Sequence, residues 1–124
     1  MLKLSWIIFF SFILLTRING AVDDTIEELQ VQLREETSEI AIIDLMIKLS
    51  DAFTQIDINK TYSYAQDAYD KSERINYKKG LVNSLIYLAL YYDSTGDRLM
   101  SIEHNNRSLE IAKSINEDRS IVAI

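Results

Sequence analysis

The chain of 124 residues repeats itself with a period of about 40 residues. Residues 72–76 align with residues 112–116, and the repeat extends upstream with an offset one residue shorter. The apolar positions that match upstream are Met46, Leu49 and Phe53 in the first copy, and Leu85, Leu88 and Tyr92 in the second. The difference falls near residues 94–97, and a change of length is tolerated better in a turn than inside a packed helix. A period of this size predicts stacked helical units, each of which buries its apolar face only against a neighbour.

Each copy has the pattern of two amphipathic helices joined by a turn. In the second copy, Leu81, Leu85, Leu88 and Tyr92 follow the spacing of one helix face. Gly96 suits the left-handed residue that ends this helix, and Asp97 can cap the helix after it. We therefore expect two helical hairpins.

The second helix of each copy should end at an asparagine. Asn76 and Asn116 occupy equivalent positions, and asparagine tolerates the left-handed conformation better than other residues that have a side chain. A shorter helix marked by Ile26, Leu29 and Leu33 is expected before the repeats, with Asp23 or Asp24 as its cap.

Residues 96–112 (GDRLMSIEHNNRSLEIA) resemble the second half of a tetratricopeptide repeat. Small residues stand where the helices of such repeats cross closely: Ser50, Thr61 and Ala68 in the first copy, and Ala89, Ser101 and Ser108 in the second. The resemblance covers about residues 41–124 and implies an all-α, tetratricopeptide-like helix-turn-helix solenoid of about 40-residue repeats. Asn105 stands where the family places an alanine or an aromatic residue, which should loosen the second copy locally. Lys48 and Tyr87 replace the asparagine with which the family clamps a partner's terminal carboxylate, so we do not expect that mode of binding.

The first residues have the pattern of a leader. Lys3 precedes an apolar run over residues 4–15, which is shorter than the roughly 20 residues needed to span a membrane. Residues 1–21 are therefore predicted to be a signal peptide, with an uncleaved signal anchor as the alternative. The remaining boundaries that we predict are 22–37 for an N-terminal capping helix, 38–77 for repeat 1, 78–117 for repeat 2 and 118–124 for the start of repeat 3.

The overlay of residues 118–124 on residues 78–84 predicts a chain truncated in a third repeat. The apolar side of the last hairpin then needs a cover, because a repeat of this kind is stable only against a neighbour. We expect either a C-terminal continuation of the polypeptide or self-association to supply it.

No residue pattern indicates catalysis or a bound cofactor. The chain has no cysteine, which excludes disulfides, iron–sulfur clusters, thiolate zinc sites and a cysteine nucleophile. His104 is the single histidine, too few for a metal site, and the acidic pairs such as Glu27–Glu28 and Glu35–Glu36 are interpreted as capping and solvated residues. We predict no catalytic, cofactor-binding or metal residue and no cofactor. The net charge of −6 argues against nucleic-acid binding by this segment.

A peptide-binding groove is expected on the side of the first helices. The outward positions there are Asp44, Lys48, Asp51 and Thr54 in copy one, and Asn83, Tyr87, Leu90 and Asp93 in copy two. A protein or peptide segment laid across this stripe is the expected partner. The seven tyrosines are interpreted either as filling between helices, with hydroxyls at the rim, or as a recognition set.

The leader, the repeats and the phrase at residues 75–80 (INYKKG) together resemble the exported sensory region of a class of bacterial regulators. In those proteins such a region precedes a transmembrane helix and a histidine-kinase or helix-turn-helix output domain. The resemblance implies a protein-binding module on the extracytoplasmic or periplasmic side of a bacterial membrane. The chain itself is not expected to be an enzyme, although a longer parent protein could be a histidine kinase. The alternative is a stand-alone periplasmic scaffold without an output domain. Contact with a membrane is expected only through residues 1–20, if they are not cleaved, or through a downstream span.

Overall fold

The computed structural model describes residues 25–122, with side chains described up to residue 119, and this part of the chain is built of helices alone. Residues 25–35 are helical, and four helices follow in order: α2 (Glu39–Ala52), α3 (Ile58–Ile75), α4 (Lys78–Ser94) and α5 (Arg98–Val122). The prediction of an all-α fold is confirmed. The predicted signal peptide and the proposed caps Asp23 and Asp24 lie outside the described residues.

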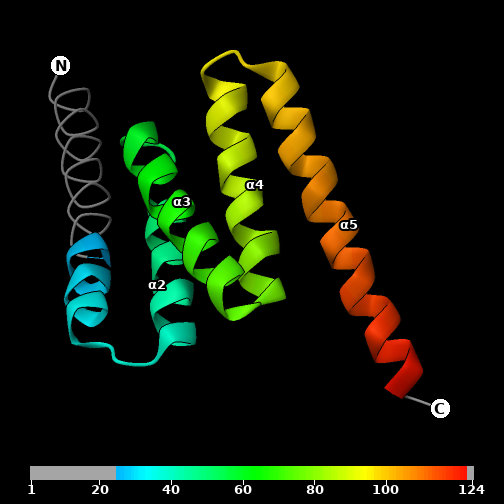
Figure 1. Cartoon of the computed structure of the whole chain (residues 1–124). Coiled ribbons are helices and arrows are strands. Elements are labelled where there is room, and N and C mark those ends of the chain that lie inside the picture. Colours follow the sequence, from blue (N-terminus) through cyan, green and yellow to red (C-terminus); the bar gives the residue numbers. More distant parts are fainter. Residues whose placement is uncertain (1–24, 123–124) are drawn as a thin grey trace, which may run out of the picture.

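The helices run back and forth, so that neighbours in the sequence are neighbours in space (Figure 1). Helices α2 and α3 form one hairpin, and α4 and α5 form the next. Helix α4 packs against α3 and also reaches α2. The two first helices of the hairpins, α2 and α4, therefore lie on a common side of the molecule.

Three residues at helix ends adopt the turn or cap conformation that the sequence predicts. Asn76 adopts the left-handed conformation with φ 56°, and Gly96 adopts it with φ 87°. The Asp97 carboxylate accepts a hydrogen bond from the Met100 N–H at 3.1 Å, which satisfies a free donor at the start of α5. The predictions for Asn76, Gly96 and Asp97 are confirmed.

The predicted helix end at Asn116 is wrong, because α5 continues through this residue to Val122. At Asn76 the chain turns because the Tyr77 N–H bonds back to the Ser72 carbonyl at 2.8 Å and α4 then packs on the preceding helices. At Asn116 the described chain makes no such turn, and the helical backbone hydrogen bonds of α5 continue past it. Residues 118–122 of the predicted third repeat therefore extend α5, and Lys78 forms an ion pair with Asp118 there at 3.0 Å.

Small residues lie at the helix crossings. The six predicted positions are all buried: Ser50, Thr61, Ala68, Ala89, Ser101 and Ser108. Ser50 and Thr61 also join α2 to α3 by two reciprocal hydrogen bonds, since each hydroxyl donates to the other residue's carbonyl at 2.8 and 2.9 Å. The crossing is thus fixed by polar as well as apolar contacts.

Helix α4 lies close against the first hairpin at Gly80. A methyl group on Gly80 would overlap the Ser72 hydroxyl and would lie 3.0 Å from Cγ2 of Ile43. Only glycine permits this approach. It allows Leu85 and Leu88 to be buried against Ala65 on α3.

The helix over residues 25–35 covers the other end of the first hairpin. Ile26 is buried against Leu49 and Phe53, and Leu29 and Leu33 pack on the same cluster. In the described part of the chain, no helix is long and apolar enough to cross a membrane.

Candidate functional site

The predicted groove residues of the first copy lie along α2 and in the turn after it. Asp44 is half-buried, and Lys48 and Asp51 are exposed. Thr54 lies beyond the end of α2, and its hydroxyl donates to the Asp51 carbonyl at 2.8 Å. Thr54 therefore closes the helix end and does not extend the helical stripe.

The predicted groove residues of the second copy all lie on α4. Asn83 and Tyr87 are half-buried, and Leu90 and Asp93 are exposed. Leu90 leaves 41% of its surface in solvent, which is high for a large apolar side chain. This half of the stripe is consequently less polar than the half on α2.

Two tyrosines connect the two halves. The Tyr77 hydroxyl donates to the Asp44 carboxylate at 2.9 Å, and the Tyr87 hydroxyl is hydrogen-bonded to Asp51. Burial, together with the neighbouring carboxylate, raises the pKa of both Tyr77 and Tyr87 to about 12. The structure thus joins Asp44 to Tyr77 and Asp51 to Tyr87.

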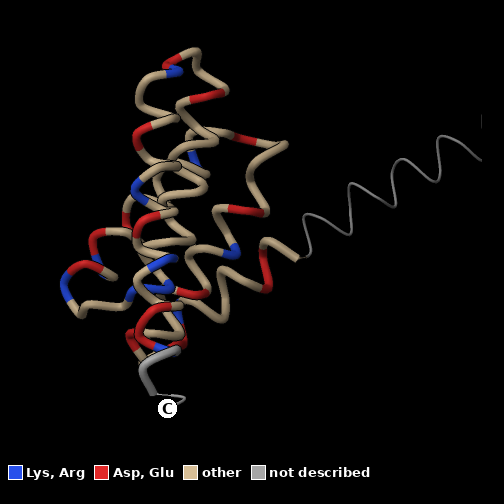
Figure 2. Tube along the Cα trace, turned by 90° about the vertical axis from the view of Figure 1, so that its right-hand side faces the viewer, with Lys and Arg blue, Asp and Glu red and all other residues tan. Residues whose placement is uncertain are grey.

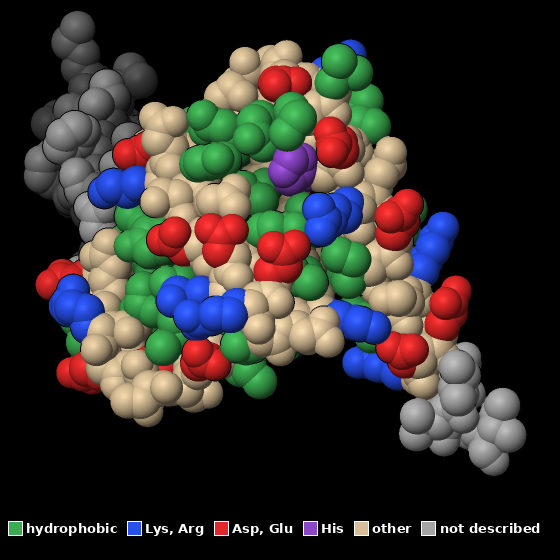
Figure 3. Space-filling model, viewed as in Figure 1, with side chains coloured by type: hydrophobic (Ala, Val, Ile, Leu, Met, Phe, Trp, Pro, Cys, Tyr) green, Lys and Arg blue, Asp and Glu red, His purple; other side chains and the backbone are tan. Residues whose placement is uncertain are grey.

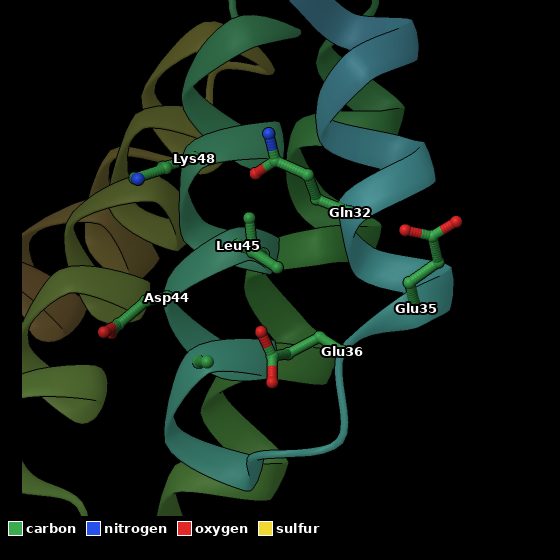
Figure 4. A pocket seen from close by; sticks show the side chains of 7 residues that line it. Gln32, Glu35, Glu36, Asp44, Leu45 and Lys48 are labelled. Carbon is green, nitrogen blue, oxygen red and sulfur yellow. The ribbon is translucent and has the colours of Figure 1, made fainter.

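A hollow opens beside α2 on its other flank, where the helix over residues 25–35 lies next to it (Figure 4). It has a volume of about 430 Å³ and is lined by Gln32, Glu35, Glu36, Ala41, Asp44, Leu45 and Lys48. Carboxylates outnumber the single lysine in this lining, so the hollow is suited to a cationic group.

The sequence reasoning missed the contribution of residues 25–36 to this hollow. The sequence indicates capping or solvated roles for Glu35 and Glu36, and Glu36 does accept hydrogen bonds from the Thr37 and Ser38 N–H groups, both at 2.9 Å. The same residues line the hollow because the turn at 36–38 brings the two helices side by side. No local sequence signal indicates that proximity.

An aromatic cluster lies on the side of the molecule away from the predicted groove, where α3 and α5 flank α4. The ring centroids of Tyr62 and Tyr91 lie 4.5 Å apart with the rings tilted by 42°, and those of Tyr92 and His104 lie 5.1 Å apart. Figure 3 shows hydrophobic side chains gathered around the histidine on this side. His104 is half-buried, and its Nδ1 lies 2.8 Å from the Met100 carbonyl. The ring is thereby tied to its own helix.

In the described part of the chain, basic and acidic residues are interspersed along the helices (Figure 2). Among residues 25–122, no group of three or more histidine or acidic side chains could hold a metal ion. Comparison with protein-family models, with curated proteins and with solved structures found no match.

Proposed function

We propose that the chain is a tetratricopeptide-like module that binds a protein or peptide segment across the side formed by α2 and α4. The observation that carries the proposal is the contact between these two helices, which joins Asp44 and Asp51 to Tyr77 and Tyr87. Helices α2 and α4 share one side, polar on α2 and mixed on α4, with a hollow beside it, and protein or peptide segments bind to surfaces shared by neighbouring elements.

The repeat architecture is supported by matched burial in the two hairpins. Ser50 and Ala89 are buried at one equivalent position, and Ala68 and Ser108 at another. Each hairpin packs mainly on its neighbours in the sequence, as stacked repeats do.

The charge of this side indicates the chemistry of the ligand. Asp44, Asp51, Asp93 and Glu36 lie on or beside it, and Lys48 is the base among them. Opposite charge on the ligand accelerates encounter and excludes wrong partners. The segment bound there is therefore one that carries lysine or arginine.

A random-peptide display library selected against the chain tests this function. We expect the enriched peptides to be basic and their binding to weaken as salt is raised. Exchanging Asp44 and Asp51 for asparagine should weaken that binding about tenfold. The matched control is Asp67→Asn with Asp70→Asn on α3, which removes the same charge elsewhere and should change nothing. Enriched peptides that bind both double variants equally well would refute the proposal.

For the parent protein, we propose the extracytoplasmic sensory region of a bacterial membrane-bound signal-transduction protein. Support comes from the apolar leader followed by acidic helical repeats. An immunoblot of membrane and soluble fractions separates this proposal from a stand-alone periplasmic scaffold. A membrane band several times larger than 14.3 kDa is expected for the sensor, whereas a soluble band no larger than the chain would favour the scaffold.

A further inference from the structure

Four apolar residues form one surface on the outer side of the second hairpin, and we call it the open face: Val82 and Ile86 on α4, and Ile102 and Leu109 on α5. Ile86 is 46% exposed, Ile102 51% and Leu109 54%. Helix α5 lies at the edge of the molecule in Figure 1, and Figure 2 looks onto that edge. The residues are spaced by one or two helical turns on two packed helices, so they share one side of this hairpin.

The internal repeat identifies an equivalent surface in the first hairpin. With the offsets of the sequence repeat, the counterparts of Val82, Ile86, Ile102 and Leu109 are Ile43, Ile47, Tyr62 and Tyr69. The first two lie on α2 and the other two on α3.

In the first hairpin this surface is covered by α4. Ile43 and Ile47 are buried at 0% and 9% exposure, and Tyr87 of α4 packs against their cluster. Tyr62 and Tyr69 pack on the cluster that holds Leu85 and Leu88 of α4. The amphipathic helix α4 therefore covers the counterpart of the open face, and Ile111 and Arg107 of α5 also contact it.

We propose that the open face binds an amphipathic helix in the way that the first hairpin binds α4. The bound helix presents large apolar residues at the spacing of Leu81, Leu85 and Leu88. It also carries a small residue where its backbone comes nearest, as α4 does at Gly80. This surface is separate from the α2–α4 side proposed above, so either proposal can fail without the other.

One residue makes the open face different from its counterpart. Asn105 is exposed and stands in the place of Ala65, which is buried against Leu85 and Leu88. Its amide would meet the apolar residues of a helix like α4 and would lose hydration there. The natural occupant must therefore offer a polar or small group at this point, and Asn105→Ala should improve the fit of an α4-like helix.

The probe is a fluorescently labelled peptide with the sequence of residues 77–95, titrated against the full chain and followed by anisotropy. We expect the peptide to bind the chain saturably. The double variant Ile102→Glu with Leu109→Glu should bind it at least about tenfold more weakly, and Asn105→Ala should bind it several-fold more tightly. Ile40→Glu is the matched control, because Ile40 has the same 51% exposure as Ile102 but lies on α2. Each variant is first shown by circular dichroism to keep its helix content.

Two outcomes would overturn the inference: no binding at millimolar peptide, or binding that the double variant leaves unchanged. Sedimentation of the chain alone identifies the source of the natural helix. Self-association that Ile102→Glu with Leu109→Glu abolishes would support the inference and show that a second copy supplies the helix. Self-association that survives this double variant would count against the open face as the contact.

Discussion

The reciprocal hydrogen bonds between Ser50 and Thr61 give the sharpest test of how the first hairpin is held together. Both residues are fully buried. At the end of α2, the Thr54 N–H donates to the Asp51 carbonyl, and the Ser50 carbonyl instead accepts from the Thr61 hydroxyl at 2.9 Å. The threonine thus satisfies a carbonyl that the helix end leaves free.

Replacing Thr61 by valine keeps the volume of the side chain and removes this donor. The free energy of unfolding should fall by about 2 kcal/mol, which combines the net contribution of the hydrogen bond with the cost of a buried carbonyl without a partner. For a domain of this size, that free energy lowers the melting temperature by roughly 8 to 16 °C. The assay is urea and thermal unfolding followed by circular dichroism.

Two controls separate the hydrogen bond from packing. Thr61→Ser keeps the hydroxyl and should cost no more than about 1 kcal/mol for the lost methyl group. Ser101 is the equivalent of Thr61 in the second hairpin, where Ala89 stands in the place of Ser50 and the reciprocal pair is absent. Ser101→Ala should therefore change the free energy of unfolding by no more than about 0.5 kcal/mol. If the free energy of unfolding of Thr61→Val lies within about 0.5 kcal/mol of the wild-type value, instead of about 2 kcal/mol below it, the reasoning is refuted.

Three further predictions concern packing and ionisation. Gly80→Ala should destabilise the fold by about 1 to 3 kcal/mol, because the new methyl group overlaps the Ser72 hydroxyl. That hydroxyl is buried without a hydrogen-bond partner in the described part of the chain, so adding Ser72→Ala to Gly80→Ala should restore part of the lost stability in urea unfolding. Leu85→Ala should cost about 2 to 5 kcal/mol because it leaves a cavity, whereas Leu99→Ala, at 81% exposure, should change the free energy of unfolding by less than about 0.5 kcal/mol. The pKa values of Tyr77 and Tyr87 near 12, above the usual 10.0, mean that the stability from their protonated hydroxyls is full below pH 10 and is lost as the pH rises through 12. In a pH titration followed by tyrosinate absorbance, part of the signal should appear only near pH 12. Tyr87→Phe should reduce that part, and unfolding in urea should shift it to about pH 10. A folded chain in which all tyrosines ionise near pH 10 would contradict the buried, carboxylate-bonded setting of Tyr77 and Tyr87.

The candidate site was predictable in part. Helix periodicity places Asp44, Lys48 and Asp51 on one helix and Asn83, Tyr87 and Leu90 on another, since spacing alone defines which residues share a face. The pairing of Asp44 with Tyr77 joins residues 33 positions apart, and the hollow beside α2 depends on how a turn orients residues 25–35. Neither is encoded by local spacing.

The sequence by itself determined the helices, the left-handed residues Asn76 and Gly96, and the small residues at the crossings, because periodicity, capping and close approach are local requirements. Tertiary structure alone decided whether an asparagine ends a helix. Asn76 and Asn116 have the same local signal, yet the chain turns only at Asn76, where α4 packs back on the first hairpin and Gly80 allows close contact. At Asn116 the described chain makes no such turn: α5 continues to Val122, and each further residue of a helix adds a backbone hydrogen bond.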